Sequence, residues 1–171
     1  MSTRQNLNSS WLFFAVTLMA FNCDNKTIVS HPGTASICGG FQAFSKQKAS
    51  TPSFSIDSAS YCEAERLWWQ YDSTRNYLNF LHARVVLNCA AKLSITAQID
   101  GDTIILNETD TRSAGVQAGC ACSFDTYLEV PNVKPGAVFV NISSKTFSID
   151  TKAGKGVFVL DSVPDSVCIQ N

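Results

Sequence analysis

The feature that most restricts how this chain can fold is an alternating segment in its second half. Over residues 120–130, one set of side chains recurs at every second position: Cys120, Cys122, Phe124, Thr126, Leu128 and Val130. A period of two is typical of a β-strand that buries one face. Residues two apart on a strand lie roughly 6.5–7 Å from each other, at or beyond the Cα separation that a disulfide spans. We therefore expect Cys120 and Cys122 to bond to different partners.

The number of cysteines indicates an oxidising compartment. The chain has seven cysteines in 171 residues, a frequency typical of exported proteins. An even number of cysteines can pair completely. We expect three disulfides among the six that follow the N-terminal region, which are Cys38, Cys62, Cys89, Cys120, Cys122 and Cys168.

The pairing of these cysteines is only partly predictable. Cys89 lies at the end of the long predicted strand Tyr77–Asn88, from which it could reach a facing strand, so we expect it to bond to Cys120 or Cys122. The cysteine left over from this choice would bond to Cys38, Cys62 or Cys168. The alternative is a metal site formed by Cys89, Cys120, Cys122 and His82. Zinc ligands usually come from turns, with two to four residues between paired cysteines, so we favour disulfides and expect no metal and no cofactor.

The N-terminal region has the pattern of an export signal. Residues 1–10 carry one side-chain charge, Arg4, and the apolar run Trp11–Phe21 follows them. Eleven residues are too few to span a bilayer as a helix, which needs about 20, and this pattern is typical of a secretory signal peptide. We predict a signal peptide over residues 1–22. Cys23 would then begin the mature chain, and both lipidation of Cys23 and simple cleavage remain open; lipidation would anchor the protein to a membrane surface.

Composition and charge exclude several classes of protein. Hydrophobic residues are 45% of the chain and charged residues 16%, with a formal net charge of −1. A chain this apolar is not intrinsically disordered. A chain this neutral lacks the excess of positive charge that nucleic-acid binding requires. We expect a polar, flexible tether over residues 23–36 and a single folded domain over residues 37–171.

Most of that domain consists of short β-prone segments separated by turn residues. The expected strands are Leu67–Tyr71, Tyr77–Asn88, Leu93–Ile99, Thr103–Asn107, 120–130, Ala137–Ile142, Phe147–Asp150 and Val157–Asp161. About seven short strands with almost no helix predict an all-β, antiparallel β-sandwich of an immunoglobulin-like or similar type. A small closed barrel is the alternative.

Local patterns give finer predictions for these segments. Asp100-Gly101 predicts a two-residue turn between two strands, and residues 72–76 a five-residue hairpin loop. Residues 63–67 could form one helical turn, and a short strand is expected near Phe54–Ile56. Phe147–Asp150 and Val157–Asp161 are expected to form the last hairpin. Within Tyr77–Asn88, one face is expected to carry Leu81, Ala83, Val85 and Leu87.

The chemistry-bearing residues give no catalytic motif. Neither Gly-x-Ser-x-Gly nor His-Glu-x-x-His occurs, so we expect a protein that is not an enzyme. The chain has two histidines: His31 is expected to be solvated in the tether, and His82 to pack within a strand.

One aromatic cluster could contact a ligand. Trp68, Trp69 and Tyr71 could form a platform for a carbohydrate or a protein partner. Adjacent residues on a strand point to opposite faces, so we expect at least one of the two tryptophans to belong to the core instead.

Three segments together show a resemblance. They are Cys62 followed by Leu67–Asp72, then Leu81–Cys89 with its Asn-Cys end, and Cys120-Ala-Cys-Ser-Phe-Asp125. In these motifs the chain resembles a group of uncharacterised bacterial cell-envelope proteins that are often predicted to be lipoproteins. The resemblance implies a β-rich exported domain and no particular activity. The group often has further cysteines where this chain has Ala90 and Ala118, which implies that one disulfide is missing here.

These patterns lead to three functional hypotheses. The first is a non-enzymatic β-sandwich protein with a structural or binding role, lipid-anchored in the bacterial cell envelope or secreted. The second is a carbohydrate- or protein-binding module that uses Trp68, Trp69 and Tyr71. The third is a thiol- or metal-handling protein that uses Cys89, Cys120 and Cys122. The identity of any partner is not predicted by the sequence.

Overall fold

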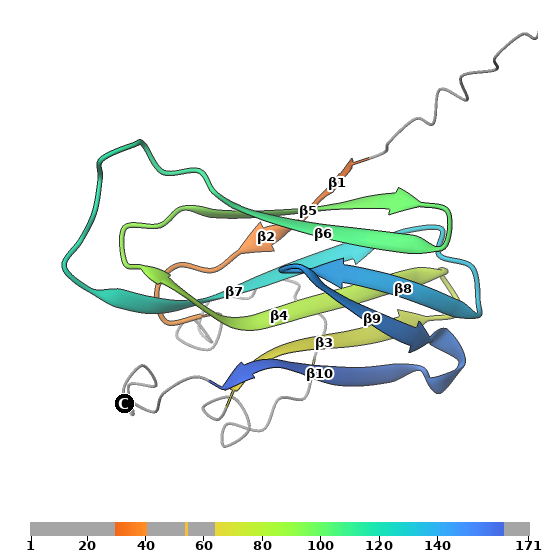
Figure 1. The fold of residues 1–171 in the computed structure, drawn as a ribbon. Helices are drawn as coiled ribbons and strands as arrows, with labels where there is room; N and C mark the ends of the chain where they lie inside the picture. The colour runs from red at the N-terminus through yellow and green to blue at the C-terminus, as the bar shows by residue number, and fades with distance from the viewer. Residues whose placement is uncertain (1–29, 41–53, 55–63, 163–171) are drawn as a thin grey trace, which may run out of the picture.

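The computed structural model describes residues 30–40, 54 and 64–162, and Figure 1 shows their arrangement. The expected signal peptide, Cys23, Cys62 and Cys168 lie outside the described residues. The strand expected near Phe54–Ile56 also lies outside them, except for Phe54, which belongs to no strand.

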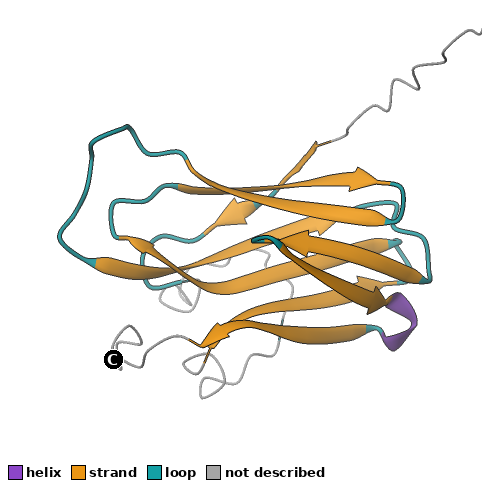
Figure 2. Cartoon of the chain, in the orientation of Figure 1, coloured by secondary structure: helices purple, strands orange, loops and turns teal. Residues whose placement is uncertain are grey.

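The described residues form ten strands in two packed sheets (Figures 1 and 2). The first sheet has the order β1-β5-β6-β8-β9 and the second the order β10-β3-β4-β7-β2. All neighbouring strands are antiparallel except β6 and β8. The strands are β1 Ser30–Pro32, β2 Thr34–Ala35, β3 Ala64–Asp72, β4 Tyr77–Asn88, β5 Leu93–Asp100, β6 Thr103–Asp110, β7 Ala121–Val130, β8 Ala137–Ile142, β9 Lys145–Asp150 and β10 Lys155–Ser162.

This architecture confirms the predicted β-sandwich. Among the described residues, the only helical segment is a 3₁₀ turn over Thr151–Ala153. None of the described residues belongs to a helix that is long and apolar enough to cross a membrane.

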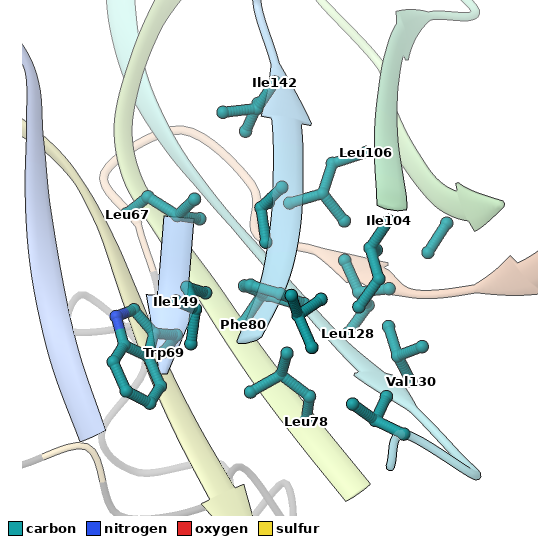
Figure 3. Packing of buried hydrophobic residues seen from close by; sticks show 14 of the residues in the cluster. Leu67, Trp69, Leu78, Phe80, Ile104, Leu106, Leu128, Val130, Ile142 and Ile149 are labelled. Atoms are coloured by element: carbon teal, nitrogen blue, oxygen red, sulfur yellow. The ribbon is translucent and has the colours of Figure 1, made fainter. Parts of the chain in front are cut away.

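The core lies between the two sheets and is apolar over most of its length (Figure 3). The second sheet supplies Leu67, Trp69, Leu78, Phe80, Leu128 and Val130, and the first supplies Ile95, Ile104, Leu106, Val140 and Ile149. As the alternating pattern predicts, Phe124 and Leu128 of β7 are buried. The opposite face of β7 is buried as well: Asp125 is 2% exposed and Tyr127 8%, and the ring of Phe54 packs against Tyr127.

A β-bulge divides β4 into two halves, and the alternation of inward and outward side chains is reversed between them. Residues paired across two strands project to the same side of the sheet. Phe80 pairs with Leu128 and Val85 with Phe124, although Phe80 and Val85 are an odd number of residues apart. Between these pairs, Ala83 and Arg84 stand opposite Asp125, and Arg84 has a φ of 67°. The Arg84 N–H donates to Asp125 Oδ1 at 3.0 Å, which holds the bulge in place.

The predicted common face of β4 is therefore wrong. Leu81 and Ala83 precede the bulge and project to the outer face, whereas Val85 and Leu87 follow it and project into the sandwich. One extra residue shifts the alternation by one position and so exchanges the two faces.

The N-terminal half of β3 also differs from the prediction. The sequence allows one helical turn over residues 63–67, but from Ala64 onward these residues belong to β3. This segment pairs with β10 on one side, through Glu65 and Asp161, and with β4 on the other, through Arg66 and Ala83. Pairing on both sides outweighs the weak helical preference of so short a segment.

The last predicted hairpin does not exist. β9 pairs with β8 in the first sheet, whereas β10 pairs with β3 in the second. Ser143 and Ser144 make the tight turn between β8 and β9, with φ values of 47° and 65°. Thr151–Ala153 then carries the chain across to the second sheet. Lys145 of β9 donates to the Leu160 carbonyl of β10, so the outer strands of the two sheets are linked by a side chain.

Two other hairpins agree with the sequence. The loop between β3 and β4 occupies residues 73–76, one residue fewer than predicted, because Asp72 still pairs with Tyr77. β5 and β6 form a hairpin in which Asp100 pairs with Thr103, so its two central residues are Gly101 and Asp102, one position later than predicted. Gly101 has a φ of 64°, which glycine adopts without strain.

Part of the expected tether is structured. β1 pairs with β5 in the first sheet, and β2 pairs with β7 in the second, so residues 30–35 bridge both layers. Gly33 makes the crossing, where a Cβ would lie 2.5 Å from the Tyr127 carbonyl oxygen and 2.7 Å from Ile95 Cγ2. Only glycine fits between the two sheets at this position. His31 is half-buried on β1 rather than fully solvated.

Candidate functional site

The three aromatic residues expected to form a ligand platform are separated by the fold. Trp69 lies in the core and is 5% exposed, which confirms that at least one tryptophan is buried. Tyr71 packs against the core, and its hydroxyl lies 3.0 Å from the Val133 carbonyl oxygen. Trp68 is on the outer face, with the Arg66 guanidinium 5.9 Å from its ring centroid. No common surface brings the three rings together.

Four cysteines form two disulfides at the N-terminal end of β7. Cys89 bonds to Cys120 and Cys38 bonds to Cys122. Cys120 and Cys122 therefore have different partners, as predicted. Cys89 bonds to one of them, also as predicted, and Cys38 is the partner of the other. The first bridge ties the end of β4 to the start of β7, and the second ties the segment after β2 to the same strand.

The alternative metal site is not assembled. The sulfurs of Cys89, Cys120 and Cys122 are all in disulfides, and His82 contacts two carboxylates instead. Among the described residues, no three His, Cys, Asp or Glu side chains gather as a metal ion requires.

His82 lies in a charged cluster between the sheets. Its Nε2 is 2.8 Å from Glu65 Oε1, and its Nδ1 is 2.9 Å from Glu108 Oε1. Glu65 belongs to β3 of the second sheet and Glu108 to β6 of the first, so the imidazole bridges the two layers. The Thr126 hydroxyl donates to Glu108 Oε1 at 2.7 Å. The His82 side chain is 1% exposed, whereas those of Glu65 and Glu108 are 20% and 12% exposed.

The two carboxylates keep this imidazole charged. Burial alone would lower the pKa of His82, and this is the largest single effect. The hydrogen bonds and charges of Glu108 and Glu65 together outweigh it and raise the pKa to about 9. The imidazolium donates from both nitrogens and so cannot accept a proton as a general base at neutral pH. The cluster therefore acts as a structural link between the sheets.

A groove on the outer face of the second sheet has a different character. It encloses about 610 Å³ between the N-terminal crossing and the end of β7. One wall is the segment His31–Thr34, and the rest comes from the β3–β4 turn, the start of β4 and the end of β7, namely Arg75, Tyr77, Tyr127, Leu128, Glu129 and Pro131. The groove combines aromatic rings with both signs of charge.

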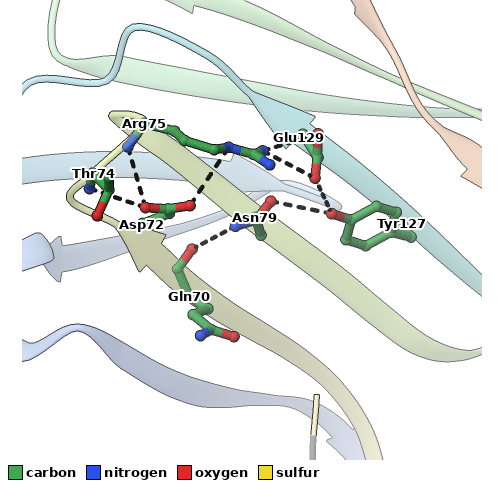
Figure 4. A network of polar contacts seen from close by, with 7 residues as sticks. All are labelled: Gln70, Asp72, Thr74, Arg75, Asn79, Tyr127 and Glu129. Atoms are coloured by element: carbon green, nitrogen blue, oxygen red, sulfur yellow. Dashed lines mark hydrogen bonds and ion pairs between the residues drawn. The ribbon is translucent and has the colours of Figure 1, made fainter. Parts of the chain in front are cut away.

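Arg75 is held at the centre of a polar network (Figure 4). Its Nε lies 3.5 Å from Asp72 Oδ2 and its Nη2 lies 3.4 Å from Glu129 Oε2. The guanidinium also lies 4.3 Å from the centroid of the Tyr77 ring, a cation–π distance. The side chains of Arg75 and Glu129 are nevertheless 51% and 39% exposed, so a ligand can reach both.

Tyr127 fixes the other end of this network. Its hydroxyl lies 2.8 Å from Glu129 Oε1 and 3.1 Å from Asn79 Oδ1, and Asn79 Nδ2 donates to the Gln70 carbonyl oxygen. Burial and the adjacent carboxylate of Glu129 raise the pKa of Tyr127 above its ordinary value of 10. The hydroxyl therefore remains protonated and donates to Glu129.

Sequence reasoning did not identify the groove residues. Arg75 lies in a turn, Tyr77 begins β4, and Tyr127 and Glu129 lie on the face of β7 opposite the core. The one relevant signal in the sequence was the second face of the alternating segment, to which Tyr127 and Glu129 belong. Nothing in that pattern predicts a contact between Glu129 and Arg75, which is 54 positions away.

Comparison with known proteins gives no relative: no family model, no curated protein and no solved structure matches the chain. The resemblance to envelope proteins therefore rests on the three sequence motifs alone.

Proposed function

We propose that this protein is an exported, non-enzymatic binding module of the cell envelope, and that its ligand site is the groove centred on Arg75 and Glu129. The observation that carries the proposal is the preorganised and accessible ion pair in that groove. Asp72 and the Tyr77 ring hold Arg75, and Tyr127 holds Glu129. A site ordered before binding loses less conformational freedom when a ligand enters.

Location in the envelope is supported by two features. The Cys38–Cys122 and Cys89–Cys120 disulfides are typical of proteins that mature in an oxidising compartment. The apolar run Trp11–Phe21 has the length and flanks of a secretory signal. Lipid anchoring at Cys23 and secretion are the two forms that this proposal allows.

A binding role is favoured over the alternatives by the chemistry of the described residues. A thiol- or metal-handling role needs reduced sulfurs, and all three cysteines proposed for it, Cys89, Cys120 and Cys122, are in disulfides. A general base needs a neutral imidazole, and both nitrogens of His82 face carboxylates. Ligand binding through Trp68, Trp69 and Tyr71 would require Trp69 to leave the core.

The location is tested by mass spectrometry of the protein purified from its native membrane or medium. We expect a mature chain that begins between Phe21 and Cys23, with or without acyl chains on Cys23. A chain that retains Met1 in that material would contradict export.

The binding role is tested on the oxidised protein by NMR of the Arg75 Nε–Hε group during titration with saccharide, peptide and lipid fractions of the envelope. We expect one fraction to shift this signal and the Arg75→Ala variant to lose retention of that fraction. Arg112→Ala is the matched control, because Arg112 pairs with Asp110 at 2.8 Å outside the groove lining. If no fraction shifts the signal, or if both variants behave alike, the groove is not the ligand site.

A further inference from the structure

We infer that the groove binds a neutral saccharide. This inference rests on the proposed binding function and names its ligand class. It depends on three properties of the described residues: the balance of charge in the groove, the donors and acceptors of the Arg75–Glu129 pair, and the short length of open strand edge beside it.

The mixture of charges in the groove disfavours strongly ionic ligands. Arg75 and Glu129 are the charged residues of the lining, and their formal charges cancel. Asp72 also contacts Arg75 and adds a second carboxylate beside the guanidinium. An anion that approaches Arg75 would meet the carboxylates of Asp72 and Glu129, and a cation that approaches Glu129 would meet the Arg75 guanidinium. Because both signs of charge lie together, a ligand without net charge avoids both repulsions.

The polar pair suits adjacent hydroxyl groups. The guanidinium of Arg75 presents only donors, and the carboxylate of Glu129 presents only acceptors. Neighbouring hydroxyls of a sugar can accept from the first and donate to the second, because each hydroxyl does both. Tyr77 and Pro131, which are half-buried in the lining, supply apolar surface for the C–H faces of the sugar.

An extended peptide fits less well. Peptides that add a strand to a sheet need a row of free main-chain groups along its edge. β2 already pairs with Tyr127 and Thr126, and Pro131, which has no N–H, follows directly after β7. Between the residues paired with β2 and Pro131, the open edge of β7 consists of residues 128–130 alone. So short an edge offers too few main-chain hydrogen bonds to hold a peptide by strand addition.

The test is an NMR titration of the oxidised protein with defined probes. Cellotetraose, maltotetraose and chitotetraose are the neutral saccharides, tetragalacturonate is the anionic one, and a set of extended hexapeptides represents peptide ligands. We expect at least one neutral tetrasaccharide to shift the Arg75 Nε–Hε signal and the ring signals of Tyr77 and Tyr127 in a saturable way. Tetragalacturonate and the hexapeptides should leave these signals in place.

Two variants locate the binding. Glu129→Gln should weaken the affinity for the responding saccharide at least tenfold, because the amide replaces an acceptor-only group, while its backbone spectrum stays folded. Arg112→Ala should bind the saccharide as the wild type does.

The outcomes separate this inference from the proposed function. A response to the hexapeptides or to tetragalacturonate, with none to the neutral saccharides, would overturn the saccharide inference and leave the groove as a binding site. If no probe shifts these signals, both the saccharide inference and the assignment of the groove as a binding site are overturned. Saturable binding that Glu129→Gln does not weaken would place the saccharide elsewhere and would also overturn the inference.

Discussion

At the scale of single residues, the most consequential side chain in the core is His82. A buried ion pair is often no more stabilising than apolar residues of the same volume, but removing one partner leaves an uncompensated charge. Here one imidazolium neutralises part of the charge of two carboxylates, one from each sheet. The polar contact between the two sheets at this point therefore depends on a single titratable group.

This gives a pH dependence of stability. The pKa of His82 is about 9 in the folded protein and 6.5 in its ordinary state, so its contribution to stability is full below pH 6.5 and is lost as the pH rises to about 9. The shift corresponds to about 3 kcal/mol of unfolding free energy. Urea unfolding at pH 6, 7.5 and 9.5 should show the wild type losing stability across this range.

The His82→Gln variant isolates the effect from other groups that titrate at alkaline pH. It keeps a polar side chain but has no charge to lose, so the stability difference between wild type and variant should shrink as the pH rises. A difference that stays constant from pH 6 to 9.5 would show that His82 is not protonated in the folded protein.

Neighbouring positions of β7 should respond very differently to substitution. Leu128 is 1% exposed between the sheets, whereas the side chain of Glu129 is 39% exposed. Leu128→Asp should abolish cooperative unfolding, because an isolated charge cannot be hydrated there. Glu129→Gln should change the unfolding free energy by less than about 1 kcal/mol. Circular dichroism melts of the two variants test the assignment, and equal melting temperatures would refute it.

At the scale of elements, Asn88 explains how β4 ends. Its Nδ2 donates to the Ala118 carbonyl at 2.6 Å, and its Oδ1 accepts from the N–H groups of Ala118 and Ala90 at 3.0 Å each. The side-chain amide thus acts as one more pairing residue of the sheet. It holds the end of the loop between β6 and β7 beside the Cys89–Cys120 bridge.

Removing this amide should loosen that end of the sandwich. Asn88→Ala loses three hydrogen bonds, each worth about 1 kcal/mol net, so we expect the unfolding free energy to fall by about 2–3 kcal/mol. Asn88→Asp keeps the acceptor and loses only the donor. Its free energy of unfolding should lie between those of the alanine variant and the wild type. Urea denaturation of the three proteins measures the order, and an alanine variant as stable as the wild type would contradict it.

The elements that could be predicted are those set by local pattern. The bounds of β4 and β8 agree with the sequence, because turn residues and alternation mark them on both sides. The facing of β4 could not be predicted, since its bulge places Arg84 at a positive φ that glycine usually occupies. The separation of β9 from β10 depends on partners distant in sequence, β8 and β3, and no local signal distinguishes it from a hairpin.

At the scale of the whole molecule, the candidate site depends on contacts that no local pattern encodes. The groove joins residues 31–34, a turn after β3 and the end of β7. The charge cluster likewise joins β3, β4, β6 and β7. The alternating segment predicts the inward position of Thr126, but the predicted common face of Tyr77–Asn88 did not include His82. The stacking of the two sheets decides which carboxylates these side chains meet. The disulfides were more predictable, because strand geometry alone excludes a bond between Cys120 and Cys122.

The two disulfides should contribute unequally to global stability. Cys38–Cys122 closes a loop of 84 residues and Cys89–Cys120 a loop of 31. In the chain-entropy model these loops correspond to about 4.6 and about 3.7 kcal/mol. The longer bridge also fastens the segment after the N-terminal crossing, whose strands join both sheets, to the start of β7.

Paired alanine substitutions test this order without leaving a free thiol. Cys38→Ala/Cys122→Ala should lower the urea midpoint more than Cys89→Ala/Cys120→Ala, by a difference close to 1 kcal/mol in the unfolding free energy. A reducing agent should lower the midpoint of the wild type below that of either variant, and a chelator should leave it unchanged, since the sulfurs bind one another. A greater loss from the 31-residue bridge would mean that the N-terminal crossing is held by its strand pairing and not by its covalent link.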